Sequence, residues 1–275
     1  MTRRTHPGRS GLPLFFVLAF ALPWLIWGTA IAEQHGLIDW HVPGALAFWI
    51  GLPVATLVAA TVSGGWPAVK DLLARMLRGR VGVRWYAAAL LLLPAMALAS
   101  AVIGAVIRHP VGVGELVPLA AVPGLLLIEV WMFLLTEETA WRGFALPRLQ
   151  RRLSPVTAAV VLGVVWSLWH LPLFLTDGSF QHGIPFAGFV LSTVAMSITT
   201  SWLFNATRGS VLLAAILHGV ADVTIAYSGV MSSGPTLFWV FVAVQCLVAV
   251  ALIPTLGRIP ASVVPDTATD VRNAV

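Results

Sequence analysis

Apolar stretches long enough to cross a bilayer recur along the whole chain of 275 residues. A helix needs about 20 predominantly apolar residues to span roughly 30 Å of hydrocarbon. Eight runs approach that length, at residues 12–32, 42–63, 85–107, 117–139, 155–176, 186–205, 209–228 and 236–257. Short segments rich in Gly, Pro or polar residues separate them, such as 64–67, 153–155 and 234–235. The pattern predicts an all-α, polytopic membrane protein with eight transmembrane helices.

The same pattern leaves no stretch for a soluble domain. We expect an N-terminal tail at 1–11, an eight-helix membrane domain at 12–257 and a C-terminal tail at 258–275. The first run follows basic residues and ends near Ala30-Ile31-Ala32, which is similar to a signal-peptide cleavage site. It is longer than a typical signal sequence, and the bulky Trp24 and Trp27 lie close to that point. We therefore expect the first helix to be retained.

The composition excludes a water-soluble enzyme. Hydrophobic residues make up 59% of the chain and charged residues only 10%, whereas about a quarter of the residues in a soluble domain are charged. The net charge is +5, but no dense basic stripe accompanies it, so we expect no nucleic-acid partner. The single cysteine, Cys246, excludes an intrachain disulfide.

The positions of the basic residues indicate how the chain is oriented. Lys and Arg are enriched in the cytoplasmic loops of membrane proteins. With eight helices and a cytoplasmic N-terminus, fifteen of the 16 basic residues fall on the cytoplasmic side and only Arg108 falls outside. The fifteen are Arg3, Arg4, Arg9, Lys70, Arg75, Arg78, Arg80, Arg84, Arg142, Arg148, Arg151, Arg152, Arg208, Arg258 and Arg272. We expect a multi-pass protein of the cell membrane with both termini in the cytoplasm.

Six ionisable residues fall in or beside the apolar runs. Charged groups at bilayer depth are costly, so each is by default a functional candidate. They are Glu129, Glu137, Glu138, His170, His218 and Asp222. These residues predict a polar site within the membrane. Glu129 has no partner in a recognisable motif, and we expect it to have a structural or cavity-lining role.

The spacing of these residues suggests how they are used. Glu138 and Arg142 are i,i+4 neighbours on a helix, in the favourable order. Glu137 points about 100° away from Glu138, so that one carboxylate pairs with the arginine while the other faces a cavity. His218 and Asp222 are also i,i+4 neighbours, which suits a carboxylate that orients an imidazole or two ligands of one metal ion.

The position of the loop at Leu153-Ser154 predicts that Glu137 and His170 lie at a similar depth in the membrane. Glu137 and His170 lie at nearly equal distances along the chain from this loop. In an antiparallel hairpin closed at this loop, both reach a similar depth, and Pro147 is expected to kink or break the first arm. His218 follows the loop at Arg208. The three segments are thus compatible with one polar pocket that opens toward the cytoplasm.

At these residues the sequence resembles the CPBP family of intramembrane proteases, which includes the CAAX prenyl endopeptidases and the Abi proteins. The family pattern is EExxxR, FxxxH and HxxxN, in this order. Here it reads Glu137-Glu138-x-x-x-Arg142, Trp166-x-x-x-His170 and His218-x-x-x-Asp222. The resemblance covers about residues 117–228 by motif. Trp166 stands where the family has Phe, which we interpret as a packing change, and Asp222 stands where it has Asn.

The resemblance implies a role for each motif residue. Glu137 and His170 would activate the attacking water, His218 and Asp222 would stabilise the oxyanion, and Glu138 with Arg142 would support the site. An ionised Asp222 cannot donate a hydrogen bond to an oxyanion, so it is either protonated, or orients His218, or binds a metal. We expect a glutamate-type mechanism without a cofactor. The alternative is Zn²⁺ held by Glu137, His170, His218 and Asp222.

Together with the resemblance, these observations favour an intramembrane endopeptidase that cuts a membrane-associated protein or peptide. The resemblance includes prenylated, CAAX-like proteins among the substrates that it implies. One alternative is a proton-coupled transporter, which would predict repeated halves with paired broken helices. No such correspondence is visible, because the polar groups gather between 129 and 222. Another alternative is a non-catalytic scaffold or bacteriocin-immunity protein.

Overall fold

The computed structural model describes residues 11–112 and 119–261, and within them every regular element is a helix. Among these described residues, seven helical segments are long and apolar enough to cross a membrane. The predicted polytopic, all-α fold is thereby confirmed. The long helices are α1 (Leu12–Gln34), α2 (Leu52–Met76), α3 (Val83–Val106), α6 (Pro155–Trp169), α7 (Phe186–Ala206), α8 (Val211–Ser228) and α9 (Pro235–Leu256).

The second apolar run is longer than its sequence suggests. A π-helix, η1 (Ala47–Gly51), continues directly into α2, so that the spanning segment extends over Ala47–Met76. The expected interruption at 64–67 is present as a kink. Gly65 takes a non-helical backbone conformation there, with φ 62° and ψ −155°, and helical geometry resumes after it. Glycine tolerates this conformation because it has no Cβ.

The fourth apolar run differs from the other seven. It contains a short 3₁₀ turn, η2 (Leu119–Ala121), and the helix α4 (Val122–Leu135). The π-helix η3 (Thr139–Ala145) begins at the last residue of the run, and α5 (Leu146–Leu149) follows beyond it. None of these is among the seven spanning segments, so the predicted count of eight is not confirmed. The break also lies earlier than expected: the backbone leaves helical geometry at Thr136 (φ −118°, ψ −95°), whereas Pro147 sits in the first turn of α5.

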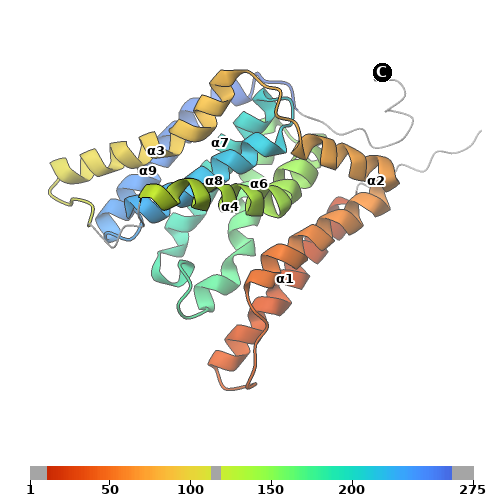
Figure 1. Cartoon of the computed structure of the whole chain (residues 1–275), viewed down its shortest axis with the longest axis horizontal. Coiled ribbons are helices and arrows are strands. Elements are labelled where there is room, and N and C mark those ends of the chain that lie inside the picture. The colour runs from red at the N-terminus through yellow and green to blue at the C-terminus, as the bar shows by residue number, and fades with distance from the viewer. Residues whose placement is uncertain (1–10, 113–118, 262–275) are drawn as a thin grey trace, which may run out of the picture.

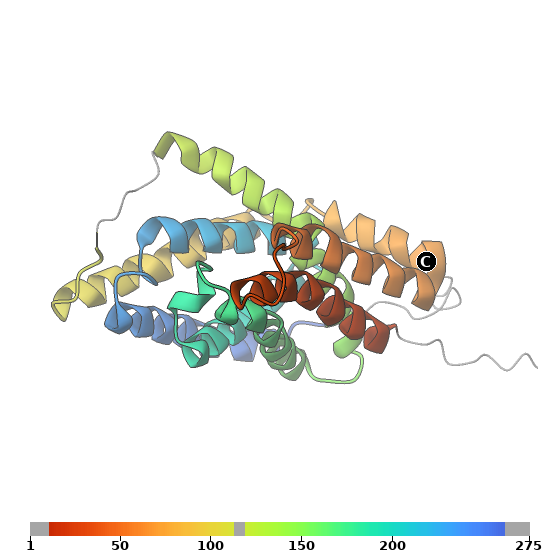
Figure 2. The ribbon, with the colours of Figure 1, turned by 90° about the horizontal axis from the view of Figure 1, so that it is seen from below.

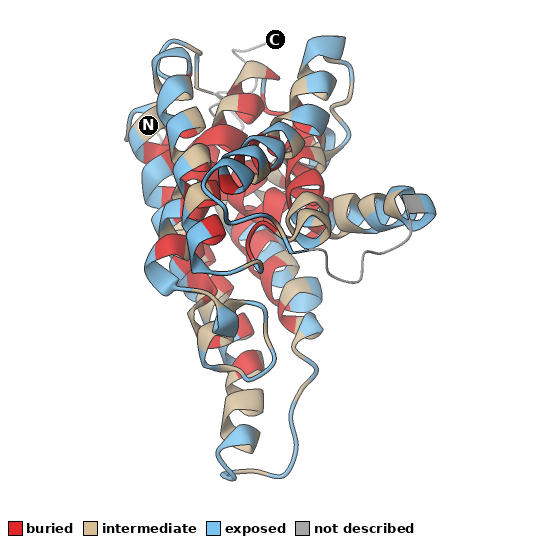
Figure 3. Cartoon of the chain, turned by 90° about the vertical axis from the view of Figure 1, so that its left-hand side faces the viewer, coloured by how far each residue is buried: buried red, intermediate tan, exposed pale blue. Residues whose placement is uncertain are grey.

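The helices form one bundle, with a pair of helices at each of two edges. In Figure 1, α1 and α2 lie together at one edge and α3 and α9 at the other, with α4, α6, α7 and α8 between them. Packing joins α6 to α7, α7 to α9 and α4 to α8. The first half of α4 stands away from its neighbours (Figure 2), and its residues Leu127 and Ile128 are exposed. Buried residues concentrate where the central helices cross (Figure 3).

Tryptophan side chains tie α1 to the end of α6. Trp169 is fully buried, and its Nε1 donates to the carbonyl of Ala19 over 2.8 Å. In return, Trp24 donates to the carbonyl of Trp169 over 3.0 Å. These bonds fix the end of α6, where the candidate residue His170 follows.

Among the described residues, three of the basic side chains assigned to the cytoplasmic side are buried. They are Arg75, Arg142 and Arg148. Arg75 pairs with Asp71 over 2.8 Å, and Arg148 donates to the carbonyl of Phe144. Some basic residues therefore make contacts inside the protein, in addition to those expected in the cytoplasmic loops.

Candidate active site

The interruption after α4 positions the two glutamates. Thr136 ends α4, and its hydroxyl donates to the carbonyl of Met132 over 2.6 Å. The chain then passes Glu137 and Glu138 and enters the π-helix η3. π-Helical turns are rare and frequently occur at functional sites. The interruption leaves both carboxylates inside the protein, where Glu137 is 2% exposed and Glu138 is fully buried.

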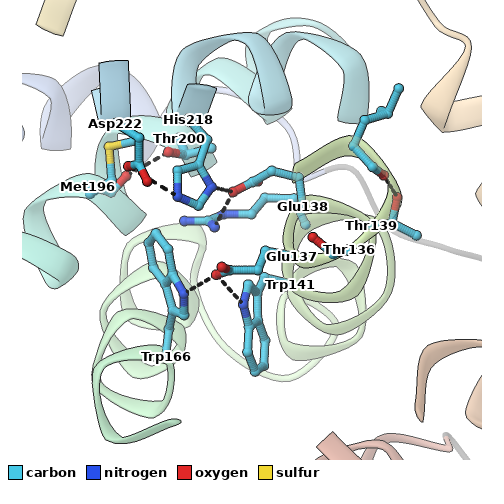
Figure 4. A network of polar contacts seen from close by, with 12 residues as sticks. Thr136, Glu137, Glu138, Thr139, Trp141, Trp166, Met196, Thr200, His218 and Asp222 are labelled. Atoms are coloured by element: carbon cyan, nitrogen blue, oxygen red, sulfur yellow. Dashed lines mark hydrogen bonds and ion pairs between the residues drawn. The ribbon is translucent and has the colours of Figure 1, made fainter. Parts of the chain in front are cut away.

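Glu137 is held by two indole groups. Its Oε2 accepts a hydrogen bond of 2.6 Å from Nε1 of Trp166 and a longer one of 3.3 Å from Nε1 of Trp141 (Figure 4). Trp141 follows on the same segment, whereas Trp166 comes from α6. The carboxylate therefore joins η3 to α6, and it also lines a cavity whose wall is mostly apolar.

Glu138 connects Arg142 to His218. Its Oε1 accepts from Nη1 of Arg142 over 2.8 Å, which confirms the predicted i,i+4 pair, and from Nδ1 of His218 over 2.8 Å (Figure 4). All three side chains are buried. Charge-assisted bonds of this kind are stronger than neutral ones, so Glu138 fixes the position of the imidazole on α8.

The imidazole of His218 is held in place by ring contacts and a hydrogen bond. Its ring stacks on Phe133 with centroids 3.5 Å apart, and the edge of Trp166 lies at 5.1 Å. Because Nδ1 is bonded to Glu138, Nε2 is the nitrogen that faces Asp222, whose Oδ1 lies 3.9 Å away. That distance is beyond a hydrogen bond. The partner that orients His218 is therefore Glu138, which the spacing of the residues did not indicate.

His170 lies immediately after the last turn of α6. Its Nδ1 donates to the carbonyl of Trp166 over 2.9 Å, because a carbonyl can only accept. In a neutral imidazole this bond leaves Nε2 as an acceptor. The ring is enclosed by Trp169 and Phe189. Trp166 thus links the two motifs, since its side chain bonds Glu137 and its carbonyl bonds His170.

A cavity of about 540 Å³ brings the predicted residues together. Glu137, His170, His218 and Asp222 all line it, although they come from three segments far apart in the sequence. Glu138 and Arg142 are not among its lining residues and lie behind His218, which does line it. Much of the remaining wall is apolar and is formed by Phe48, Leu125, Met132, Phe133, Phe180, Phe189, Met196, Val223, Ile225, Ala226 and Met231.

Further polar residues reach the cavity without belonging to a motif. Glu129 lines it, in agreement with the expected cavity-lining role, and its Oε2 is buried without a hydrogen-bond partner in the described structure. Gln245 of α9 also lines it and accepts a bond of 2.6 Å from Ser192 of α7. Gln245 lies in an apolar run and could have been singled out as a polar residue at membrane depth.

Close helix crossings set the position of these groups. At Gly219, next to His218, a Cβ atom would lie 3.0 Å from the backbone nitrogen of Val130. At Gly163 in α6, a Cβ atom would lie 2.7 Å from the Cα of Val194 in α7. Glycine at these points lets α8 approach α4 and α6 approach α7, as small residues do in membrane helix pairs.

The side chains of the zinc alternative do not form a metal centre as arranged. Within 11–112 and 119–261, no group of three or more His, Cys, Asp or Glu residues is placed to hold an ion. His218 directs Nδ1 to Glu138, and Glu137 is bonded to two indoles. The donor set thus does not fit Zn²⁺ in this arrangement, and no step below depends on a metal.

The fold and this cavity define a class: a polytopic membrane protein with a buried cluster of glutamate and histidine side chains. Comparison with known proteins agrees. Residues 118–224 match the family model described as type II CAAX prenyl endopeptidase Rce1-like. Over 223 residues the chain is 27% identical to CAAX prenyl protease 2 of Methanococcus maripaludis, with 74% of this chain and 80% of that protein covered. The resemblance drawn from the motifs is confirmed, and both matches support an intramembrane protease.

Proposed function

We propose that this protein is an endopeptidase that hydrolyses a peptide bond of a membrane-associated protein, with Glu137 and His170 activating the attacking water. Proteins with prenylated, CAAX-like C-termini are the first substrates to test, because the relative named above is a CAAX prenyl protease. The observation that carries the proposal is the shared cavity, which is lined by Glu137, His170 and His218 from three distant segments.

The proposed base is Glu137. Both indole bonds end on Oε2, so Oε1 is the oxygen that would accept a proton from water. A general base must lie within hydrogen-bond reach of the proton that it removes. Nε2 of His170 is an acceptor on the same cavity and would accept a hydrogen bond from the second hydrogen of the water, while the proton taken up by Glu137 would pass to the leaving amine.

His218 is the proposed oxyanion donor. Its Nδ1–H is directed to the carboxylate of Glu138, which would stabilise the imidazole when Nε2 also carries a proton and donates to the oxyanion. Arg142 pairs with the same carboxylate and keeps it in place. Glu138 and Arg142 therefore act as positioning residues, behind the wall of the cavity.

The test is a cleavage assay with the purified protein in proteoliposomes and a prenylated peptide substrate. We expect Glu137→Gln and His170→Ala each to lower kcat by roughly 10²- to 10⁴-fold, the usual contribution of a general acid or base. Glu33→Gln is the matched control, because Glu33 lies at the far end of α1 and pairs with His41. Undiminished cleavage in both cavity variants would contradict the proposal.

Two further arms of the same assay separate the alternatives. We expect activity to survive a chelator; a loss that added Zn²⁺ restores would favour the metal mechanism instead. Proton-coupled flux of the peptide across the vesicle without a cleaved product would favour a transporter.

A further inference from the structure

A second hollow, of about 680 Å³, lies at the ends of four spanning helices. It is formed by the loop from α2 to α3, the first turn of α3 and the turn between α7 and α8. Its lining residues are Arg78, Arg80, Val81, Gly82, Arg84, Trp85, Ala206, Thr207 and Arg208. We call it the arginine hollow. None of its residues belongs to the motifs of the candidate active site.

The charge of the arginine hollow is concentrated and uncompensated by its own lining. Four arginines and no acidic residue form its wall. Arg84 lies over the ring of Trp85, 4.8 Å from the centroid, and is exposed. Arg75, in the last turn of α2, differs from Arg84 because it is buried and pairs with Asp71. A set of guanidinium groups in one concave surface is suited to a phosphate, which accepts their planar fork of donors.

The backbone of the arginine hollow is held in place by hydrogen bonds. The hydroxyl of Tyr86 donates to the carbonyl of Gly79 over 2.8 Å, and the hydroxyl of Ser210 donates to the carbonyl of Arg78 over 2.5 Å. The guanidinium of Arg78 donates to the carbonyl of Arg208, which joins the two loops across 130 positions of sequence. These bonds hold the backbone of the two arginine-bearing loops in one conformation, which lowers the conformational entropy lost when a ligand binds.

The start of α3 adds to the positive potential. Gly82, the residue before the helix, is extended and provides no side-chain cap to the first N–H groups of α3, although the N–H of Trp85 donates to the carbonyl of Gly82. The positive end of the helix dipole lies here as well. Anions bind readily at such helix ends.

The surroundings of the arginine hollow point to a lipid rather than a soluble anion. Leu77 and Val83 flank it and are 81% and 83% exposed. Trp85 is half-buried against Trp202, as expected for an aromatic residue at the membrane interface. Apolar side chains that face outward beside arginines suit acyl chains next to a phosphate. We propose that the arginine hollow binds the headgroup phosphate of an anionic phospholipid of the surrounding leaflet.

The experiment measures lipid binding to the whole protein, by native mass spectrometry of purified protein titrated with phosphatidylglycerol or phosphatidylcholine. The test variants are Arg80→Gln and Arg84→Gln, whose side chains are exposed. The matched controls are Arg152→Gln and Arg258→Gln, which are also exposed and lie outside the hollow. Thermal unfolding in phosphatidylcholine checks that each variant is folded.

We expect the protein to bind phosphatidylglycerol more tightly than phosphatidylcholine. Each hollow variant should weaken phosphatidylglycerol binding by roughly five-fold, the effect of about one arginine near a membrane surface. The control variants should bind as the unsubstituted protein does. Equal weakening in the controls, or no preference for the anionic lipid, would overturn the proposal. Displacement of the lipid by an equal concentration of inorganic phosphate would identify a soluble phosphate site instead and would overturn it as well.

Discussion

Trp166 contacts four other residues of the candidate site. Its indole N–H bonds Glu137, its carbonyl accepts from His170, and its ring contacts His218 and the guanidinium of Arg142. From the sequence we interpreted it as a packing substitute for the Phe of the family pattern. Phenylalanine has no N–H and cannot make the bond to the carboxylate, so the interpretation as packing alone is wrong for this chain.

The substitution Trp166→Phe tests the importance of that bond. Hydrogen bonds to charged groups contribute about 1.5–3 kcal/mol, so we expect kcat to fall by roughly ten-fold or more while KM changes little. Trp141→Phe is the comparison, because its bond to Glu137 is longer, at 3.3 Å, and its effect should be smaller. A rate for Trp166→Phe within about two-fold of the unsubstituted protein would restore the packing interpretation.

Asp222 is the second departure from the family pattern. Its carboxylate lies 3.9 Å from Nε2 of His218 and lines the cavity. An amide at this position could donate to an oxyanion, which an ionised carboxylate cannot. We therefore expect Asp222→Asn to keep or raise kcat in the cleavage assay. A loss as large as that of His218→Ala would mean that the carboxylate itself is required.

Contacts between distant residues account for what the sequence did not reveal about the site. The pair Glu138–Arg142 follows from helical spacing alone, and it is present. The bond between Glu138 and His218 joins residues 80 positions apart and depends on how α4 packs against α8. Spacing within one helix carries no information on such a contact, so the sequence predicted which residues matter but not which partner orients each.

Helix interruptions were the least predictable elements of the fold. Apolar length located seven of the spanning segments, because burial of apolar residues in the bilayer dominates where such helices form. It did not locate the π-helix after Thr136 or the continuation of α2 past Gly65. Hydrogen bonds of Thr136 and Thr139 to carbonyls of α4 accompany the first of these, and no periodic pattern reports such local bonds.

The close crossing of α6 and α7 is tested by Gly163→Ala. The added Cβ would lie 2.7 Å from the Cα of Val194, so the helices must separate, and overpacking of this kind costs about 1–3 kcal/mol. We expect a lower melting temperature in detergent. Gly28→Ala is the matched control in α1, where nothing lies within 4 Å of the added atom. Equal melting temperatures for the two variants would contradict the importance of this crossing.

The number of membrane crossings determines where the termini lie. Eight crossings place both ends on one side, as the basic residues predict, whereas seven would place them on opposite sides. The seven recognised spans leave the interrupted segment from α4 to α5 as the deciding element. The orientation of the whole molecule therefore depends on its least regular segment.

Cysteine labelling in intact cells tests this orientation. With Cys246→Ala as background, we expect an impermeant maleimide to label Asp39→Cys and Ser232→Cys from outside. Arg152→Cys and Arg258→Cys should react only after permeabilisation. Labelling of Arg258→Cys in intact cells would show an odd number of crossings and would contradict the prediction of eight.

The most direct test of the central claim is a double-mutant cycle on the cleavage rate, with Glu137→Gln, His170→Ala and both together. If the two residues activate one water, removal of either abolishes the shared step, and effects of residues that act as a unit are far from additive. The account predicts that the double variant is no slower than the slower single variant. Rate losses that multiply, or cleavage that persists in all three variants, would contradict it.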